Sequence, residues 1–474
     1  MPTISCQFDS ALITVNNMSG LDAHQPDSTI KTMYISRLPS SPIESIKTSL
    51  LIGVVINTVI TFARIFGRWK TPSKKAQTDL AVMSLMDKIY WVHKVKQPIL
   101  IPESDNPLQR TSLTPRASYL PEGFKVDQQV TIGAVGDLMK VDGLEYSQDF
   151  LYDRVADLLF DKDIIYGNLE SQLTTQEIKE IVFSDKEGPP LCCTLEQYQA
   201  STTHLGRHFT LMHTACNHTL DMGLEGLQTT QKQLDQDGIL ELGTNREEGE
   251  QNQGRILEMN GIRLGFISAT FGLNGRDVPG GETFRVNVSR LHDPAGSVDL
   301  DLLLAQLADC RNKGCDFIIA SLHWGYEYEF FPRTQQVEVA HELIEAGVDA
   351  IIAHHAHVIQ PLEVYQTRRD PDRVAVIAYS LGNLTSPFST PAIALSQILN
   401  LNLCKGISGG KQQTYIDLYN LVPTIQIEKE NDGRPALQLE KLDEIRKTGD
   451  PQLKPYLDKV AEFAERVKGE WRSR

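Results

Sequence analysis

The residues best able to do chemistry in this sequence are carboxylates, amides and histidines that follow short apolar runs. Asp137 ends the run VTIGAVGD (130–137), and Asn168 and Glu170 end the run DIIYGNLE (163–170). Four later apolar runs are followed in the same way by Asn217, His218, His323, His355, His357 and Asn383. Carboxylates, amides and imidazoles are the ligands that divalent Mn, Fe, Zn or Mg take in proteins, and no thiolate is needed. The pattern therefore predicts a metal site assembled from several separate segments.

Each of these residues, taken alone, also has a simpler explanation. A Gly-Asp pair after a strand is commonly a turn, Asn217 could cap a helix, and His323 could belong to an aromatic turn. Packing explains the neighbouring histidines His354, His355 and His357 less well. Because several polar groups recur at the same place relative to apolar runs, we favour a shared functional site.

Buried strands that alternate with helices are the elements that must position these residues. Residues 223–238 and 335–347 have apolar side chains at helical spacing and a glycine at the end, which is typical of helices with a glycine cap. Near-continuous apolar runs lie before, between and after them, at 130–137, 163–170, 208–218, 262–270, 316–325, 349–358 and 374–383. This alternation predicts an α/β protein with buried sheets. Since the carboxyl ends of strands face the functional crevice in such folds, the polar residues are expected to meet there.

Composition and charge narrow the classes of function. The 474 residues carry a net charge of −15, and the acidic excess lies after residue 125. This charge argues against a general nucleic-acid binder, so we expect no nucleic-acid partner. A hydrophobic fraction of 41% is enough for a core and too low for a polytopic membrane protein. The seven cysteines are odd in number and include no C-x-x-C pair, which favours reduced thiols over a disulfide framework or a zinc ribbon.

An uncharged stretch, TSLLIGVVINTVITFA (48–63), leaves the location of the protein open. Extended to Gly67, it approaches the roughly 20 residues that span a bilayer. It could be an anchor helix, a signal-like apolar region, or a buried or interfacial helix. The basic residues that follow it would keep that flank in the cytoplasm. We therefore predict that the chain is either membrane-associated through residues 48–67 or cytoplasmic.

The chain divides into three predicted parts. An N-terminal helical extension covers residues 1–127, with the apolar stretch, a helix over 79–95 and a Pro-rich and Ser-rich linker over 97–126. The main domain covers residues 128–425. Residues 426–474 hold most of a hairpin predicted around an Asn-Asp-Gly turn (425–439), followed by an amphipathic helix (453–471).

Six motifs then occur in order along the main domain: GDLM (136–139), GNLES (167–171), ACNHTLDMGLEGLQTT (215–230), LHWGYEY (322–328), AHHAHVIQPLEVY (353–365) and YSLGNL (379–384). Together they resemble the motifs of the capsule-synthesis CapA proteins, also called poly-γ-glutamate biosynthesis proteins. That family belongs to the calcineurin-like metallophosphoesterase superfamily. The resemblance covers about residues 128–400 and implies a two-sheet α/β/β/α sandwich.

The resemblance also implies roles for the motif residues. Two divalent ions would be held by Asp137, Glu170, Asn217, His323, His355 and His357, with Glu170 in the bridging position. His218 would protonate the leaving group or bind phosphate, and Asp221 and Glu327 would orient histidines. Asn168, Glu327 and Asn383 are expected to lie at the substrate, a phosphoester or an anionic polymer. The two ions would polarise a phosphoryl oxygen and activate water.

Several residues depart from the family pattern. Met139 stands where the superfamily has the histidine of Asp-x-His, so one ion site loses a ligand. Cys216 replaces an Asn, Ala353 and Ala356 replace a Gly and a Pro, and His354 is interpreted as a neighbour of the ligands.

Three hypotheses about function follow. The first is a metal-dependent hydrolase linked to capsule or exopolymer assembly. The second is a weakly catalytic or non-catalytic component of a membrane polymer-synthesis complex that binds metal or polymer. The third, a purely structural cation site, is less favoured because ligands from separate strand ends form open sites.

Overall fold

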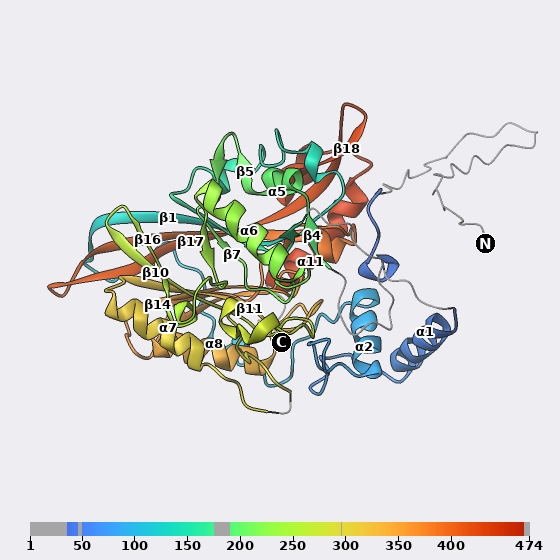
Figure 1. Cartoon of the computed structure of the whole chain (residues 1–474), viewed down its shortest axis with the longest axis horizontal. Helices are drawn as coiled ribbons and strands as arrows, with labels where there is room; N and C mark the ends of the chain where they lie inside the picture. Colours follow the sequence, from blue (N-terminus) through green and yellow to red (C-terminus); the bar gives the residue numbers. More distant parts are fainter. Residues whose placement is uncertain (1–35, 46–49, 175–189, 295, 469–474) are drawn as a thin grey trace, which may run out of the picture.

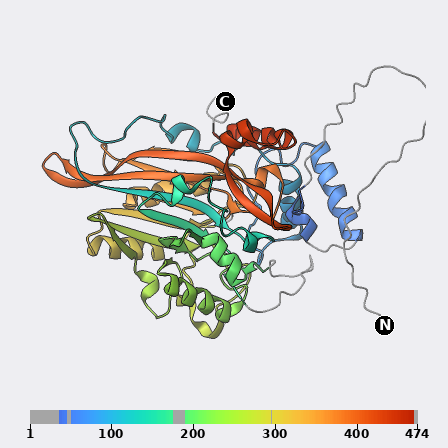
Figure 2. The same cartoon turned by 90° about the horizontal axis from the view of Figure 1, so that it is seen from above.

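Two β-sheets packed face to face form the centre of the molecule, and helices cover their outer faces (Figure 1). The computed structural model describes residues 36–45, 50–174, 190–294 and 296–468. Figure 2 shows the two sheets as stacked layers from above, with α1 projecting at one end. The predicted two-sheet α/β/β/α sandwich is confirmed.

The larger sheet has eight strands in the order β18-β17-β16-β1-β2-β7-β8, with β15 paired to β1. Its strands are β1 (Lys125–Leu138), β2 (Ile164–Leu169), β7 (Leu211–His213), β8 (Leu240–Leu242), β15 (Asn383–Thr385), β16 (Leu395–Ser408), β17 (Lys411–Asn431) and β18 (Arg434–Lys441). The strands β1, β2, β7 and β8 are parallel to one another. In the pairing register, Asp137 lies opposite both Asn168 and Asn383, so three predicted site residues start from neighbouring backbone positions.

The smaller sheet has six strands in the order β13-β14-β12-β11-β10-β9. They are β9 (Arg255–Met259), β10 (Ile262–Thr270), β11 (Phe317–His323), β12 (Ala350–His354), β13 (Leu362–Gln366) and β14 (Val374–Ala378). The four strands β10, β11, β12 and β14 are parallel, and the pairing places His323 opposite His354. Two small pairs lie outside the main sheets: β3 (Gln172–Leu173) with β4 (Cys192–Cys193), and β5 (Thr203–His204) with β6 (Arg207–His208).

Alternation of side chains along each strand divides the apolar residues between two faces. Ile132 and Ala134 of β1 point into the core between the sheets, whereas Val135 packs under the helices outside. In β11, Ile319 enters the same central core and Ile318 faces the outer helices. The sequences of these strands are therefore continuous apolar runs, because one face packs against the other sheet and the opposite face packs against helices.

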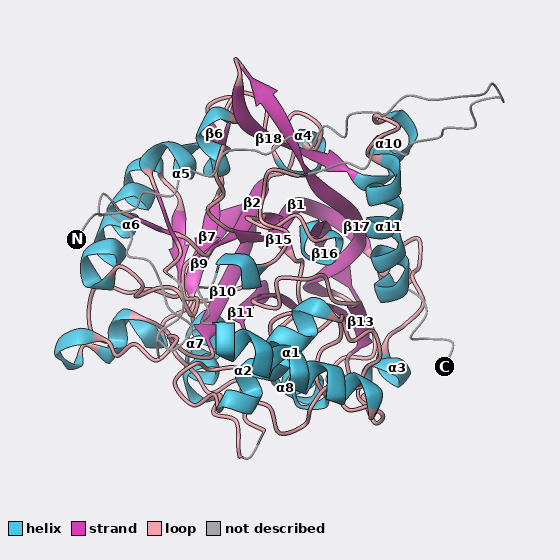
Figure 3. Cartoon of the chain, turned by 90° about the vertical axis from the view of Figure 1, so that its right-hand side faces the viewer, coloured by secondary structure: helices cyan, strands magenta, loops and turns pink. Residues whose placement is uncertain are grey.

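The outer layers are formed by helices on each side of the sandwich (Figure 3). The α-helices are α1 (Leu50–Ile65), α2 (Leu85–Lys96), α3 (Leu108–Thr111), α4 (Ala156–Leu159), α5 (Leu195–Thr202), α6 (Gly223–Asp237), α7 (Asp301–Asn312), α8 (Thr334–Ala346), α9 (Pro391–Ala394), α10 (Leu442–Thr448) and α11 (Lys454–Lys468). Short 3-10 turns are η1 (Pro42–Ser45), η2 (Leu144–Tyr146), η3 (Glu250–Asn252), η4 (Pro279–Gly281) and η5 (Thr283–Arg285).

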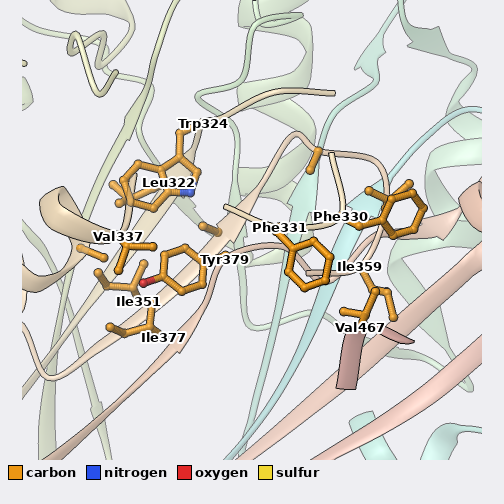
Figure 4. Packing of buried hydrophobic residues seen from close by; sticks show 14 of the residues in the cluster. Leu322, Trp324, Phe330, Phe331, Val337, Ile351, Ile359, Ile377, Tyr379 and Val467 are labelled. Atoms are coloured by element: carbon orange, nitrogen blue, oxygen red, sulfur yellow. The ribbon is translucent and has the colours of Figure 1, made fainter. Parts of the chain in front are cut away.

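Packing on the outer face of the smaller sheet involves large aromatic side chains. The rings of Trp324 and Tyr379 stack with their centroids 6.4 Å apart, close to Val337 of α8 and Ile351 of β12 (Figure 4). Both rings are almost fully buried. This cluster anchors Trp324 directly after β11 and so holds His323, the last residue of β11, in a rigid setting.

Within the N-terminal extension, α1 and α2 pack side by side at one end of the sandwich (Figure 1). Ile56 and Ile60 of α1 contact Ile89 and Val92 of α2. Among the helices of the described residues, none has the length and apolar character needed to cross a membrane. The predicted apolar stretch forms the 16-residue α1, and residues 48–49 lie outside the described part.

Two segments continue the sheets beyond the limits expected from the sequence. The segment predicted as a linker, 97–126, runs along both sheets, where Leu113 N–H donates to Val364 O and Tyr119 N–H donates to Asp417 O, each at 2.8 Å. The hairpin predicted around Asn-Asp-Gly is formed by β17 and β18. The predicted boundary at residue 425 falls inside β17, so this hairpin extends the larger sheet. The domain limits remain a prediction.

Candidate metal centre

The six predicted metal ligands meet where the parallel strands of both sheets end. Asp137 lies near the end of β1, Glu170 follows β2, His323 ends β11, and His355 and His357 follow β12. Together with Asn217, which lies in the loop between β7 and α6, these side chains are buried, and none is more than 4% exposed. The two sheets therefore supply the site jointly.

Three overlapping groups of side chains among the described residues have donor atoms close enough to share a cation. Within each group the donor atoms lie within 4.8 Å of one another. The groups are Glu170 with His323 and His355, Asp137 with Glu170 and His357, and Glu327 with His355 and His357. Glu170 belongs to two groups, as a carboxylate in a bridging position would.

The carboxylates lie near histidines without satisfying all of their own oxygens. His357 Nε2 and His323 Nε2 lie 3.6 and 3.7 Å from Glu170 Oε1, and His357 Nδ1 lies 3.3 Å from Asp137 Oδ2. None of these three contacts has hydrogen-bond geometry. Within the described residues, both Glu170 carboxylate oxygens, Asp137 Oδ2 and His355 Nδ1 are buried without a hydrogen bond. Unpaired buried polar atoms are costly, and a divalent cation would satisfy all of them. These residues therefore fit a metal ion.

Burial and mutual contacts shift the pKa values of the carboxylates and of His357 in the site. Burial raises the pKa of Glu170 well above its usual range, against the opposing effect of His357. Burial would also raise the pKa of Asp137, but His354 and His357 outweigh it and hold that pKa well below its usual range. Burial lowers the pKa of His357, whereas Glu170 and Asp137 together raise it to about 10. A cation bound here would favour ionised Glu170 and neutral His357, so binding would release protons.

The backbone of the histidine loop is held in an unusual conformation. His355 has a φ of 95° and His357 a φ of 56°, in the left-handed region that residues with a side chain rarely adopt. Tyr328, with a φ of 60°, donates its N–H to Ala356 O at 2.7 Å and so fixes the middle of the loop. Such strain concentrates at functional sites.

A close approach of two chain segments places Asp137. A Cβ atom on Gly136 would lie 1.8 Å from Gly382 O, so only glycine fits there. The same carbonyl accepts the Asp137 N–H at 3.0 Å. Gly136 therefore brings Asp137 against the segment that carries Asn383.

The predicted catalytic pair lies beside this group. His218 Nδ1 is 2.6 Å from Asp221 Oδ2, and the other Asp221 oxygen lies 2.8 Å from Arg276 Nη1. The Asp221 side chain is buried and is held on both sides, so it can fix the orientation of the imidazole. If Nδ1 carries the proton shared with Asp221, Nε2 is the ring nitrogen available to a substrate.

The three asparagines contact predicted ligands. Asn168 Nδ2 donates to Asp137 Oδ1 at 2.9 Å, and Asn383 Oδ1 lies 3.0 Å from His357 Nδ1. Asn217 Oδ1 lies 2.8 Å from His323 Nε2. The structure thus gathers every predicted site residue in one region, although the individual roles at metal and substrate remain predictions.

Comparison with known proteins identifies the family. A family model described as "Bacterial capsule synthesis protein PGA_cap" matches residues 131–387, more than half of the chain. The chain belongs to this family. It is 26% identical over 271 residues to "Capsule biosynthesis protein CapA" of Bacillus anthracis, covering 56% of this chain and 61% of that protein. It is 27% identical over 305 residues to "PGA biosynthesis protein CapA" of Bacillus subtilis (strain 168), covering 63% and 74% of the two chains.

The chain therefore spans less than two thirds of the B. anthracis relative. Among solved structures, it is similar to the calcineurin-like phosphoesterase YfkN from Bacillus subtilis, at 16% identity over 71% of this chain and 100% of that one. The TM-score of this match is 0.35. The family predicted from the six motifs is confirmed by the sequence matches.

The departures from the pattern of the capsule-synthesis family are structurally accommodated. Met139 is buried, and its backbone exchanges hydrogen bonds with the Thr385 hydroxyl, which accepts from Met139 N–H at 3.0 Å and donates to Met139 O at 2.7 Å. His354 is buried with Nε2 2.6 Å from the Tyr166 hydroxyl and Nδ1 3.4 Å from Asp137 Oδ1. It contacts a predicted ligand, as expected of a neighbouring residue.

Two contacts to the site come from the N-terminal extension and were not predicted. The Trp91 indole N–H donates to the Glu327 carboxylate, and Thr78 Oγ1 lies 3.5 Å from His355 Nε2. The helix containing Trp91 was predicted, but nothing in its periodicity showed which surface it would cover. These contacts join segments more than 200 residues apart, which a single sequence does not reveal.

Proposed function

We propose that this member of the capsule-synthesis family is a divalent-metal-dependent hydrolase of the phosphoesterase type. Its substrate would be a phosphoester or an anionic polymer of the poly-γ-glutamate class. One observation carries the proposal: buried, unpaired carboxylate oxygens and histidines from both sheets converge beside the His218–Asp221 pair.

The metal would be held by Asp137, Glu170, His323, His355 and His357, with Asn217 at its edge. When bound, divalent ions polarise the scissile group and lower the pKa of water. The chain's own residues would transfer the proton and orient the ligands. His218, oriented by Asp221, would give a proton from Nε2 to the leaving oxygen. The asparagines beside Asp137 and His357 would keep those ligands in place.

A role in polymer assembly is supported by the printed descriptions of the relatives, which concern capsule and PGA biosynthesis. We extend that role to this chain as part of the proposal. The experiment below tests the substrate and the number of bound ions.

The test measures bound metal and hydrolysis with the full chain. Wild type, His355→Ala, His218→Ala and a control, His208→Ala, would be assayed with Mn²⁺ on a generic phosphodiester and on poly-γ-glutamate. His208 is only partly buried and lies in β6, outside the metal centre. We expect the His355 variant to lose metal and activity, and the His218 variant to keep metal and lose activity. A wild type without metal, or site variants that match the control, would refute the proposal.

A second candidate function is a metal-binding or polymer-binding component with little or no turnover. Two observations favour it: Met139 occupies a ligand position of the superfamily, and the six predicted metal ligands are each at most 4% exposed. The same assays, together with a measurement of poly-γ-glutamate binding, separate the two functions. Metal and polymer binding with no hydrolysis of either substrate would establish the non-catalytic role.

A further inference from the structure

The N-terminal extension lies against the metal centre at the end of the sandwich that faces the viewer in Figure 3. Thr78 precedes α2 and reaches His355, while Trp91 within α2 reaches Glu327. Both partners belong to the same group of candidate ligands, together with His357. The extension therefore meets the centre at two separate ligands.

Packing holds this part of the extension in a defined place. Ser84 and Asp87 form a capping box that starts α2 at Leu85. On the domain side, Glu329 accepts hydrogen bonds from Lys94 Nζ at 3.1 Å and from the Tyr90 hydroxyl at 3.2 Å. These buried polar contacts fix the position of α2 on the domain, and with it the position of Trp91.

The turn that begins at Asp79, next to Thr78, lies close to a loop of the domain. A Cβ atom on Gly272, in the loop after β10, would lie 2.8 Å from Asp79 Oδ2. The neighbouring Phe271 packs its ring on that of His355, with centroids 4.5 Å apart. The turn and this loop thus enclose His355 from two sides.

The two ring nitrogens of His355 have different surroundings. Nδ1 is buried and has no hydrogen-bond partner among the described residues, whereas Nε2 faces the Thr78 hydroxyl. A metal-binding histidine commonly donates its second N–H to an acceptor, which sets its tautomer and ring orientation. The Thr78 oxygen can be that acceptor, which leaves Nδ1 for the metal.

Trp91 orients the Glu327 carboxylate, as Thr78 orients the His355 ring. Its indole N–H is a donor only, so it holds one part of the Glu327 carboxylate and leaves the remaining lone pairs free. Glu327 is partly exposed, in contrast to the fully buried Glu170, and gains a defined orientation from this bond.

We propose that Thr78 and Trp91 are positioning residues of the metal centre, and that the N-terminal extension is therefore a part of that centre. This inference rests on the proposed metal-dependent function. It assigns to the extension a role in metal affinity that is independent of any membrane contact.

The test compares metal binding by full-chain variants in the absence of substrate. Thr78→Val and Trp91→Phe remove the polar atom and keep most of the shape, and Thr78→Ser restores the hydroxyl. Tyr90→Phe is the matched control, because it removes one buried hydroxyl from the same helix and leaves in place the Lys94–Glu329 ion pair that holds α2 on the domain. Co²⁺ is the probe, with affinity from competition with a chromophoric chelator and coordination from its visible absorption.

We expect Thr78→Val and Trp91→Phe each to weaken Co²⁺ binding about 10- to 100-fold and to change the visible spectrum. Thr78→Ser and Tyr90→Phe should stay within about threefold of wild type, a margin far below the usual effect of removing a ligand's partner. If both polar-to-apolar variants bind Co²⁺ as wild type does, or if Tyr90→Phe weakens binding equally, the inference is wrong. A wild-type chain that binds no metal overturns the proposed function and this inference together, whereas unaltered variants of a metal-binding wild type overturn this inference alone.

Discussion

Replacing Glu329 by glutamine should release the N-terminal extension from the domain. The Glu329 carboxylate is 1% exposed and accepts hydrogen bonds from Arg333 Nε at 2.9 Å and Nη2 at 2.8 Å, as well as from Lys94 and Tyr90 of α2. Glu329→Gln keeps the shape but removes the charge that forms an ion pair with both of these buried cations. Lys94 and Arg333 are only 4% and 5% exposed.

The expected loss can be worked from this geometry. At the 3.1 Å separation of Lys94 Nζ and Glu329 Oε1, two unit charges attract by about 5 kcal/mol at an effective dielectric constant of about 20. Removing one partner of a buried pair costs about 3–5 kcal/mol, because the other charge stays buried and uncompensated. Lys94→Met should cost less, since Glu329 would keep its two hydrogen bonds to Arg333.

The pH dependence has a definite sign. Burial would raise the pKa of Glu329, but Arg333 and Lys94 lower it from an ordinary 4.5 to about 2. A depressed folded-state pKa stabilises the protein above pH 4.5, and this stabilisation is lost as the pH falls towards 2. At about 1.4 kcal/mol per pKa unit, the loss amounts to roughly 3 kcal/mol in wild type and should be absent in Glu329→Gln.

Hydrogen exchange of the α2 amides, residues 85–96, measures the effect directly. Each 1.4 kcal/mol corresponds to a tenfold change, so Glu329→Gln should speed exchange at neutral pH by about 100-fold or more, and Lys94→Met by clearly less. Amides of β10 and β11 in the same spectra serve as internal controls. Exchange of α2 within threefold of wild type, or an equal effect of both variants, would refute this account of how the extension is held.

Three further predictions concern the metal centre. Glu170→Gln should abolish metal binding. In the presence of a chelator, the unfolding temperature of this variant should match or exceed that of wild type, because burial disfavours the charged form of Glu170; a drop of more than a few degrees would contradict this. Gly136→Ala should destabilise the fold by more than about 3 kcal/mol in denaturant titrations, since its Cβ would meet Gly382 O at 1.8 Å; a change below 1 kcal/mol would contradict it. Divalent metal at 100 times its Kd should raise stability by about 2.7 kcal/mol in thermal unfolding, and EDTA should reverse the gain; identical curves with metal and with EDTA would refute the metal site.

The strand ends were predictable from the sequence because one physical rule governs them. Residues buried on both faces give continuous apolar runs, and the run at 262–270 coincides with β10. Asp137 and Glu170 then lie at the same end of the larger sheet because β1 and β2 are parallel, and His323 lies at the end of β11 in the smaller sheet. The ends of α6 and α8 were equally clear, since Gly238 and Gly347 adopt positive φ values at the helix ends.

Other features could not be predicted from the local pattern of apolar and polar residues. The predicted helix over 79–95 begins only at Leu85, because the Ser84–Asp87 capping box starts it there. The 21-residue strand β17 contains Pro423 and many polar residues, and its long pairing with β16 rather than its own periodicity keeps it extended. The contacts of Thr78 and Trp91 with the centre depend on tertiary packing alone.

The energetics of the centre argue against a purely structural role for a cation bound there. His355 and His357 hold left-handed backbone conformations that cost about 1–3 kcal/mol each. Glu170 is buried with neither carboxylate oxygen hydrogen-bonded in the described structure, and this adds a further desolvation cost. A site selected only for stability would relax this strain or replace the carboxylate by an apolar side chain. Strain and unpaired charge beside an oriented His218 are instead the features of a site whose geometry serves binding or turnover.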